Sequence, residues 1–191
     1  MTRILLLLAA LIFIRCTPPQ TFPVAQIKTD KGEILFWLHD QTPEHKKSFI
    51  TLAEGGYWDS LTFNRVIKNF VVQGGCPDTP AGFADSPYLL KPEFNAHLKH
   101  VYGAVGGGRD DNPDKRTAGC QFYIVQNKDG LPRLDGDYVI FGQVFKGMEV
   151  VDAIVEVEKD SLHAPVAPIK LDVNILHLTK EELEKNGYVL N

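Results

Sequence analysis

One stretch of this 191-residue chain decides how the rest is interpreted: Phe63-Asn64-Arg65-Val66-Ile67-Lys68-Asn69-Phe70-Val71-Val72-Gln73-Gly74-Gly75. A single arginine, Arg65, stands among apolar residues, and an amide, Gln73, follows it after an apolar run. Arginine is seldom buried unless its five donors are satisfied. The stretch therefore predicts either an ion pair between Arg65 and an acid such as Asp135 or Glu93, or a donor aimed at a bound molecule.

Composition places the chain among ordinary globular proteins. Hydrophobic residues make up 44% of it and charged residues 23%, which is typical of a domain with a real core. A length of 191 residues suits one such domain. The formal net charge is -4, and without a basic cluster this predicts no nucleic-acid partner.

The N-terminal residues differ from the rest of the chain. An apolar run from Ile4 to Ile14 follows Arg3, and it is shorter than the roughly 20 residues that a membrane-spanning helix needs. We therefore predict a secretory signal peptide over residues 1–15, with an uncleaved anchor as the alternative. Cys16 resembles the lipid-attachment cysteine of bacterial lipoproteins, although Arg15 stands where those sites have a small residue.

Export sets the expected location of the protein. Residues 16–23 are rich in proline and predict a stiff, extended tether, and residues 24–191 are predicted to form the domain. We expect a protein of the periplasm, or a lipoprotein that Cys16 anchors to the outer membrane.

Two further cysteines, Cys76 and Cys120, remain. An oxidising compartment would allow them to pair, provided that their Cα atoms lie about 4.4–6.8 Å apart. We favour two small buried thiols, because pairing cannot be read from sequence. No Cys-x-x-Cys pair signals a zinc site or a redox motif.

Short β-prone runs dominate the domain. Thr42 and Pro43 predict the cap and first residue of a helix that ends at Gly55-Gly56, and Thr179 with Glu182 predicts a capping box for a short C-terminal helix. Without β-α-β alternation, the pattern favours a mainly β fold, a closed antiparallel barrel with helices at its ends. The predicted strands lie at 24–29, 33–38, within 63–75, and at 101–105, 121–125, 138–145 and 169–178.

Residues 76–98 have no sustained period, and we predict a long ordered loop that forms one wall of a groove. The glycine run Gly106-Gly107-Gly108 follows the strand predicted at 101–105. No Lys-Ser or Lys-Thr pair follows the run, which disfavours phosphate binding. Glycines also let a bound peptide approach the backbone closely, so a peptide site is the better interpretation.

The remaining chemistry is defined by three polar side chains beside aromatic residues: Arg65, Gln73 and Gln121. No Ser/His/Asp set, carboxylate pair or metal-ligand spacing stands out, so we predict no metal and no cofactor, and a hydrolase is disfavoured. A cation with two amides and several aromatics suits the binding of a peptide and the polarisation of its amide.

An ordered set of motifs resembles the cyclophilin-type peptidyl-prolyl cis/trans isomerases over about Val24 to Leu178. The resemblance implies an eight-stranded antiparallel barrel capped by two helices, with the site on its outer face. The matching segments are Phe63-Asn64-Arg65, Phe70, Gln73-Gly74-Gly75, Gln121-Phe122-Tyr123-Ile124 and Leu134-Asp135-Gly136 through Phe141-Gly142.

Carried over residue by residue, the resemblance implies that Arg65 is the catalytic arginine. Gln73 and Gln121 would hold Arg65 and the substrate carbonyl. The residues implied to line the proline pocket, or to contact the residues before proline through their backbone, are Phe70, Val71, Gly108, Arg109, Tyr123, Leu134 and Tyr138.

Four positions depart from the family's usual residues. Val71 stands where methionine is usual, and Tyr138 and Asn64 stand where histidine is common. Arg133 replaces the tryptophan of members that are sensitive to cyclosporin. The last departure implies weak binding of that drug.

The activity that the resemblance implies is faster rotation about X-Pro bonds in exported proteins. The barrier to peptide rotation is about 18–20 kcal/mol and arises from resonance. A guanidinium that donates to the proline nitrogen would favour the unconjugated form. The expected partners are proline-containing peptides and unfolded exported proteins, and the chain is expected to be a monomer.

Two other functions stay open. A periplasmic chaperone or scaffold would keep the groove without useful turnover, although a pure binder has no need of Arg65. A thiol redox protein would need a reactive thiolate at Cys76.

Overall fold

A computed structural model of the protein describes residues 18–59, 61–76 and 88–190. The predicted signal peptide, Cys16 and residues 77–87 of the predicted loop lie outside these ranges. Within the described part of the chain, no helix is both long enough and apolar enough to cross a membrane.

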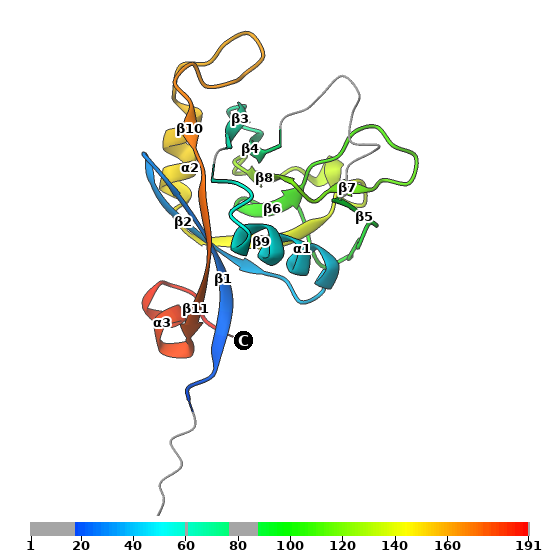
Figure 1. The fold of residues 1–191 in the computed structure, drawn as a ribbon. Coiled ribbons are helices and arrows are strands. Elements are labelled where there is room, and N and C mark those ends of the chain that lie inside the picture. The colour runs from blue at the N-terminus through cyan, green and yellow to red at the C-terminus, as the bar shows by residue number, and fades with distance from the viewer. Residues whose placement is uncertain (1–17, 60, 77–87, 191) are drawn as a thin grey trace, which may run out of the picture.

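Antiparallel strands form one nearly closed barrel, as predicted (Figure 1). Its strand order is β10-β3-β4-β8-β6-β9-β2-β1-β11. The two short strands β5 (Leu89–Leu90) and β7 (Thr117–Ala118) pair separately. The strands of the barrel are β1 (Thr21–Thr29), β2 (Gly32–Leu38), β3 (Thr62–Val66), β4 (Val71–Gly75), β6 (Ala104–Gly107), β8 (Gln121–Val125), β9 (Ile140–Lys146), β10 (Ile169–Lys170) and β11 (Asp172–Thr179).

One long strand closes the barrel. β10 pairs with β3 through Ile169 and Phe63, and β11 pairs with β1 along its whole length. Only Leu171 separates β10 from β11, and its N–H donates to the carbonyl oxygen of Leu61 at 3.0 Å. Counted as one strand, β10 and β11 turn the nine-stranded sheet into the predicted eight-stranded barrel.

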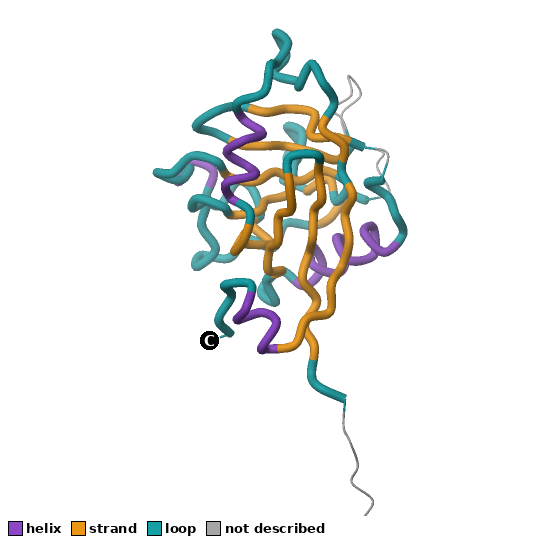
Figure 2. Tube along the Cα trace, turned by 90° about the vertical axis from the view of Figure 1, so that its left-hand side faces the viewer, coloured by secondary structure: helices purple, strands orange, loops and turns teal. Residues whose placement is uncertain are grey.

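The β1–β11 pair extends beyond the barrel and carries α3 (Lys180–Lys185) at its end (Figures 1 and 2). β1 begins at Thr21, so the last three residues of the predicted tether belong to this pair. The predicted capping box is present. The backbone N–H of Glu182 donates to Thr179 Oγ1 at 3.3 Å, and the backbone N–H of Thr179 donates to the Glu182 carboxylate at 2.8 Å.

Two helices flank the barrel, α1 (Pro43–Glu54) and α2 (Met148–Val155), and a short 3-10 helix, η1 (Pro132–Leu134), precedes β9. α1 buries Phe49 and α2 buries Ile154 in one core with the inward residues of the strands. Rings dominate this core, and those packed around Phe49 are Phe36, Trp58, Phe122 and Phe141.

The N-terminus of α1 is capped from a distant part of the chain. Thr42 occupies the predicted cap position, but its side chain makes no capping hydrogen bond. The carboxylate of Glu93 accepts instead, from the backbone N–H groups of Glu44 at 3.1 Å and of His45 at 3.0 Å. The predicted role of the Thr42 side chain was therefore wrong, because a carboxylate satisfies the free N–H groups of the first turn.

Candidate active site

Four residues line up in register across four neighbouring strands. Arg65 on β3 pairs with Gln73 on β4. Gln73 pairs with Tyr123 on β8, and Tyr123 pairs with Gly106 on β6. Successive residues of a strand point to opposite faces, so Phe122 enters the core while this row faces outward.

Arg65 is held by an amide and a ring. Its Nη1 donates to Gln73 Oε1 at 3.3 Å, and its guanidinium carbon lies 5.6 Å from the centre of the Phe70 ring. Asp135 and Glu93, the two acids considered as its partners, each bind a histidine instead. In the described part of the chain, no carboxylate pairs with Arg65. The ion-pair interpretation with these two acids is therefore excluded.

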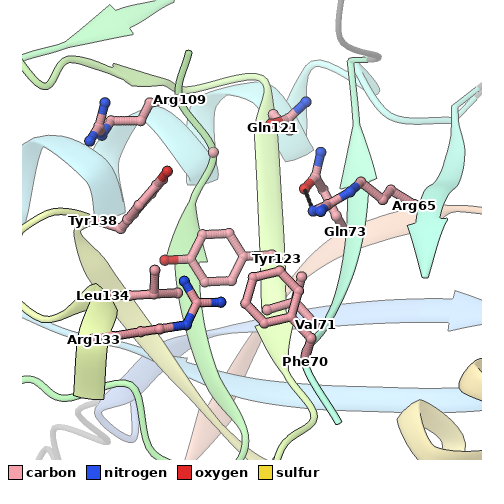
Figure 3. A pocket seen from close by; sticks show the side chains of 11 residues that line it. Arg65, Phe70, Val71, Gln73, Arg109, Gln121, Tyr123, Arg133, Leu134 and Tyr138 are labelled. Atoms are coloured by element: carbon pink, nitrogen blue, oxygen red, sulfur yellow. Dashed lines mark hydrogen bonds between the residues drawn. The ribbon is translucent and has the colours of Figure 1, made fainter. Parts of the chain in front are cut away.

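A pocket of about 210 Å³ opens at this row of residues. Arg65 and Gln73 lie on one side of the Tyr123 ring, and Arg109 and Tyr138 lie on the other (Figure 3). All ten site residues predicted from the sequence line the pocket, although their roles stay predictions. The described residues that line the pocket are Arg65, Phe70, Val71, Gln73, Gly108, Arg109, Gln121, Tyr123, Arg133, Leu134 and Tyr138.

The floor of the pocket is apolar. Val71, Tyr123 and Leu134 are buried and pack in one cluster, with Phe70 and Tyr138 half-buried against it. A small concave apolar surface with polar groups along one side is a typical ligand site. Its shape and chemistry suit a compact apolar ring that carries an amide.

The glycine run leaves space for side chains of the protein itself. A Cβ atom at Gly106 would collide with the ring of Tyr123, and one at Gly108 would collide with the amide of Gln121. The predicted strand 101–105 was misplaced, because β6 runs from Ala104 to Gly107 and takes up two of the glycines. The approach of a bound peptide to these glycines stays a prediction.

A disulfide joins Cys76 and Cys120, with Cα atoms 5.5 Å apart. The preferred prediction of two free thiols was therefore wrong. Gly75 and Gln121 are paired in register on β4 and β8, which places the two cysteines beside each other. The Gln121 Nε2 donates to the carbonyl oxygen of Cys76 at 2.9 Å, so the disulfide lies directly behind one of the predicted catalytic residues.

Behind the pocket floor, Tyr123 is tied to a buried histidine. The hydroxyl of Tyr123 lies 2.8 Å from Nε2 of His100, and Nδ1 of His100 lies 2.7 Å from Oδ1 of Asp135. Burial lowers the pKa of His100 below its ordinary 6.5, against the influence of Asp135. A neutral His100 donates a hydrogen bond from Nδ1 to Asp135 and accepts one at Nε2 from the hydroxyl of Tyr123.

The ionisation of the two partners of His100 follows from their surroundings. Burial raises the pKa of Tyr123 well above 10.0, so its hydroxyl stays protonated. Burial also raises the pKa of Asp135, but the hydrogen bonds from His100 outweigh it and hold that pKa below 3.8. The three groups therefore form a chain with one carboxylate charge at neutral pH.

Two more arginines stand over aromatic rings at the edge of the pocket. The guanidinium carbon of Arg109 lies 4.6 Å from the centre of the Tyr138 ring, and its Nε and Nη1 donate to two backbone carbonyl groups at 3.0 and 2.8 Å. The guanidinium carbon of Arg133 lies 4.9 Å from the centre of the Phe70 ring, and this residue is exposed.

The sequence analysis did not assign His100, Asp135 or Arg133 to the site. His100 and Asp135 are far apart in sequence and share no motif, so only the tyrosine offered a signal. A buried tyrosine hydroxyl usually needs a hydrogen-bond partner, and the period of β8 places Tyr123 away from the core. Arg133 was noted as a departure from the family, but nothing in the sequence placed its side chain over Phe70.

Comparison with known proteins shows what the chain is similar to. Residues 24–179 match the family model described as cyclophilin type peptidyl-prolyl cis-trans isomerase/CLD. A peptidyl-prolyl cis-trans isomerase-like 1 of Neurospora crassa is 35% identical over 161 residues, which is 83% of this chain and 96% of the relative. A peptidyl-prolyl cis-trans isomerase of Helicobacter pylori is 36% identical over 137 residues, 68% of this chain and 78% of the relative.

The fold agrees with a solved structure as well. A cyclophilin type peptidyl-prolyl cis-trans isomerase of Cryptosporidium parvum, crystallised in the presence of the dipeptide Ala-Pro, superposes with a TM-score of 0.71. The two are 29% identical, and the match covers 82% of this chain and 99% of the other.

Proposed function

The chain belongs to the cyclophilin-type peptidyl-prolyl cis-trans isomerases and is thus an isomerase enzyme, and from this premise we propose that Arg65 drives the rotation by donating to the proline nitrogen. The observation that carries the proposal is the 3.3 Å hydrogen bond from Arg65 Nη1 to Gln73 Oε1 beside an apolar floor. The amide fixes the guanidinium without neutralising its charge.

The chemistry needs a donor placed where electron density develops. The peptide bond resists rotation by about 18–20 kcal/mol because the nitrogen lone pair is delocalised into the carbonyl. At mid-rotation the lone pair returns to a pyramidal nitrogen, which then accepts a hydrogen bond. A preorganised donor in a partly desolvated site stabilises that state more than the planar ground state.

The other pocket residues would hold the substrate. The cluster of Val71, Tyr123 and Leu134 gives the proline ring an apolar floor, and Gln121 stands at the side of the pocket where the substrate carbonyl would lie. The solved relative that was crystallised in the presence of Ala-Pro supports a proline-containing peptide as the ligand of this chain.

The rate of isomerisation of one proline peptide tests the role of Arg65. We expect Arg65→Ala to lower kcat/KM by roughly 100-fold, which is the usual effect of losing one preorganised donor. Arg65→Lys keeps the charge but loses the planar guanidinium, so its kcat/KM should lie between those of wild type and Arg65→Ala. Arg116→Ala is the matched control, because Arg116 lies outside the pocket lining. Equal rates for wild type and Arg65→Ala would refute the mechanism.

The same experiment separates an enzyme from the binding chaperone considered as an alternative. Peptide binding by wild type without any acceleration of exchange would favour the chaperone. Turnover that falls on removal of Arg65 while peptide binding is kept would favour the enzyme.

We also propose that this isomerase works on exported proteins, either in the periplasm or as a lipoprotein of the outer membrane. The apolar run from Ile4 to Ile14 supports export. The Cys76–Cys120 disulfide supports it independently, because such bonds persist in oxidising compartments. Cys16 would carry the lipid, with residues 17–20 between it and β1 in the sequence.

The state of the mature N-terminus tests the export proposal. Mass spectrometry of protein from cell fractions should find a chain that begins at Cys16 with added acyl mass, and Cys16→Ala should move it from the membrane to the soluble fraction. An unmodified chain that begins at Met1 in the cytoplasm would refute export. A cleaved but unacylated chain would retain the periplasm and refute the anchor.

A further inference from the structure

The pocket is positively charged in a chain that is negatively charged as a whole. Three arginines line it, Arg65, Arg109 and Arg133, and none of the described residues of its lining is an aspartate or glutamate. The formal net charge of the whole chain is -4, so the positive charge is a local feature of this site. We propose that the enzyme selects peptides that carry an acidic residue close to the proline, and that Arg133 binds the acidic side chain; this rests on the function proposed above.

In the part of the chain that the structure describes, the acids nearest to the pocket do not cancel its charge. Asp135 follows Arg133 closely in sequence, but its carboxylate binds His100 and lies 3.4 Å from Lys99 Nζ. Asp137 is paired with Lys115. Asp135 and Asp137 therefore each have a cation outside the pocket lining, and the carboxylate of Asp110 accepts from the side chain of Asn112 at 2.8 Å.

Of the three arginines, Arg133 is the one whose guanidinium makes no hydrogen bond among the described residues. Arg65 donates to Gln73, and Arg109 uses Nε and Nη1 on backbone carbonyl groups. Arg133 is exposed, and among the described residues its one specific contact is the face of the Phe70 ring. A guanidinium stacked on a ring keeps its edges open, and these edges can donate two parallel hydrogen bonds to a carboxylate.

The position of Arg133 is fixed by the backbone. It is the middle residue of η1, which closes with a 2.9 Å hydrogen bond from Leu134 N–H to the carbonyl oxygen of Leu131. The next residue, Leu134, forms part of the pocket floor. Arg133 thus stands at the rim of the proline pocket on a short rigid element.

Geometry also limits how far the acid can lie from the proline. The guanidinium carbons of Arg65 and Arg133 lie 5.6 and 4.9 Å from the centre of the same ring, that of Phe70. An extended peptide advances about 3.3 Å per residue. A peptide whose proline nitrogen meets Arg65 therefore reaches Arg133 with a residue about one to three positions away.

A panel of short proline peptides tests the proposal. Each peptide carries glutamate, glutamine or lysine at one of the three positions before or after the proline, and alanine elsewhere. We expect wild type to show a kcat/KM roughly fivefold higher for glutamate than for glutamine at one position on one side, the size of one partly exposed ion pair. The lysine peptide should be the poorest substrate at the same position.

Salt gives an independent readout. The Debye length falls from about 10 Å at 0.1 M salt to about 3 Å at 1 M, so the ratio of glutamate to glutamine should shrink towards one. A ratio that is unchanged by salt would mean that shape, not charge, produces the preference, and it would overturn the proposal.

Arginine variants identify the residue responsible. Arg133→Gln should bring the glutamate-to-glutamine ratio to about one, and Arg133→Glu should reverse the order so that lysine is preferred. Arg116→Gln is the matched surface control and should keep the ratio. A preference for glutamate peptides that persists in Arg133→Glu would overturn the assignment. So would a preference that is lost in Arg109→Gln but kept in Arg133→Gln.

The outcomes also separate this proposal from the proposed function. No acceleration with any peptide would refute the catalytic proposal. In that case the affinity of the protein for each peptide is measured instead, and equal affinities for the glutamate and glutamine peptides would refute the selection of acids. Acceleration of all peptides with a ratio near one at every position refutes the selection alone.

Discussion

His45 and His100 sit in nearly the same environment, yet only one of them reaches the pocket. Each is buried, and each has Nδ1 against a carboxylate that also accepts from its own backbone N–H: Glu93 for His45, at 2.5 and 3.0 Å, and Asp135 for His100, at 2.7 and 3.0 Å. The difference lies at Nε2. That of His100 meets the hydroxyl of Tyr123, whereas that of His45 has no partner among the described residues.

The His45–Glu93 and His100–Asp135 pairs therefore have the same geometry but different structural roles. Through Glu93, the first pair fastens a distant segment to the start of α1 and leaves the ring of His45 packed near Phe141. The second pair lies behind Tyr123 and fixes the ring that forms the floor of the pocket. A histidine–carboxylate pair is thus a structural unit in this protein, and the partner at Nε2 of the histidine decides whether the pair supports the pocket.

Removing either carboxylate should give the largest effect. We expect Glu93→Ala and Asp135→Ala each to lower the free energy of unfolding by about 2–3 kcal/mol, because buried N–H groups lose their acceptor. Only Asp135→Ala should also lower kcat/KM, since Tyr123 loses its support. Urea unfolding and peptide isomerisation measure the two quantities. An equal loss of activity in both variants would contradict the distinction between the pairs.

Replacing the histidines should give a smaller contrast. His100→Leu leaves the Tyr123 hydroxyl without its acceptor, whereas no group loses a hydrogen bond to Nε2 in His45→Leu. His100→Leu should therefore lower the free energy of unfolding by about 1 kcal/mol more than His45→Leu. The double variant His100→Leu/Tyr123→Phe should recover this difference in a double-mutant cycle. A cycle with no coupling energy would show that the hydrogen bond does not contribute.

Tyr123→Phe alone should make the two pairs alike. It removes the hydroxyl and leaves the ring, so we expect a loss of about 0.5–1.5 kcal/mol in stability and a modest fall in kcat/KM. The pKa of His100 should rise, because the lost hydrogen bond favoured the neutral ring. Titration of the histidine ring protons by NMR would check this, with His45 as the internal control. An unchanged pKa of His100 would argue against the contact.

Lowering the pH should give the smallest change near neutrality. Burial lowers the pKa of both His45 and His100 below 6.5. Below pH 6.5 the unfolded chain therefore binds more protons than the folded chain, and stability falls as pH decreases. The carboxylates add to the loss at lower pH, because the folded pKa of Glu93 lies below 4.5 and that of Asp135 below 3.8. Unfolding midpoints that rise from pH 7 to pH 5 would contradict this.

The sequence predicted best what regular strands carry. Gln73 and Tyr123 lie on β4 and β8, where alternation assigns their outward face. Arg65 is two residues from the buried Phe63 on β3 and faces outward because the register of β3 shifts between the two. The capping box at Thr179 was also predicted, because it involves two residues only three positions apart in the sequence. Local rules of this kind depend on nearby residues only.

Contacts between distant segments were predicted worst. The cap of α1 comes from Glu93 and not from Thr42, and the pairing of Cys76 with Cys120 depends on the register of β4 and β8. His100 meets Asp135 across two connecting loops. Periodicity in a single sequence does not predict these contacts, because each contact forms only between segments that the closed barrel brings together.

The sequence by itself therefore determined the mainly β barrel, through its strand pattern. It also determined the family and ten residues that line the pocket, through the ordered motifs that resemble the family. Only the tertiary structure decided what supports and charges that pocket: the chain from Tyr123 through His100 to Asp135, the disulfide behind Gln121, and Arg133 over Phe70. The physical reason is that a side chain's partner is fixed by proximity in space, and proximity across loops emerges only when the chain has folded.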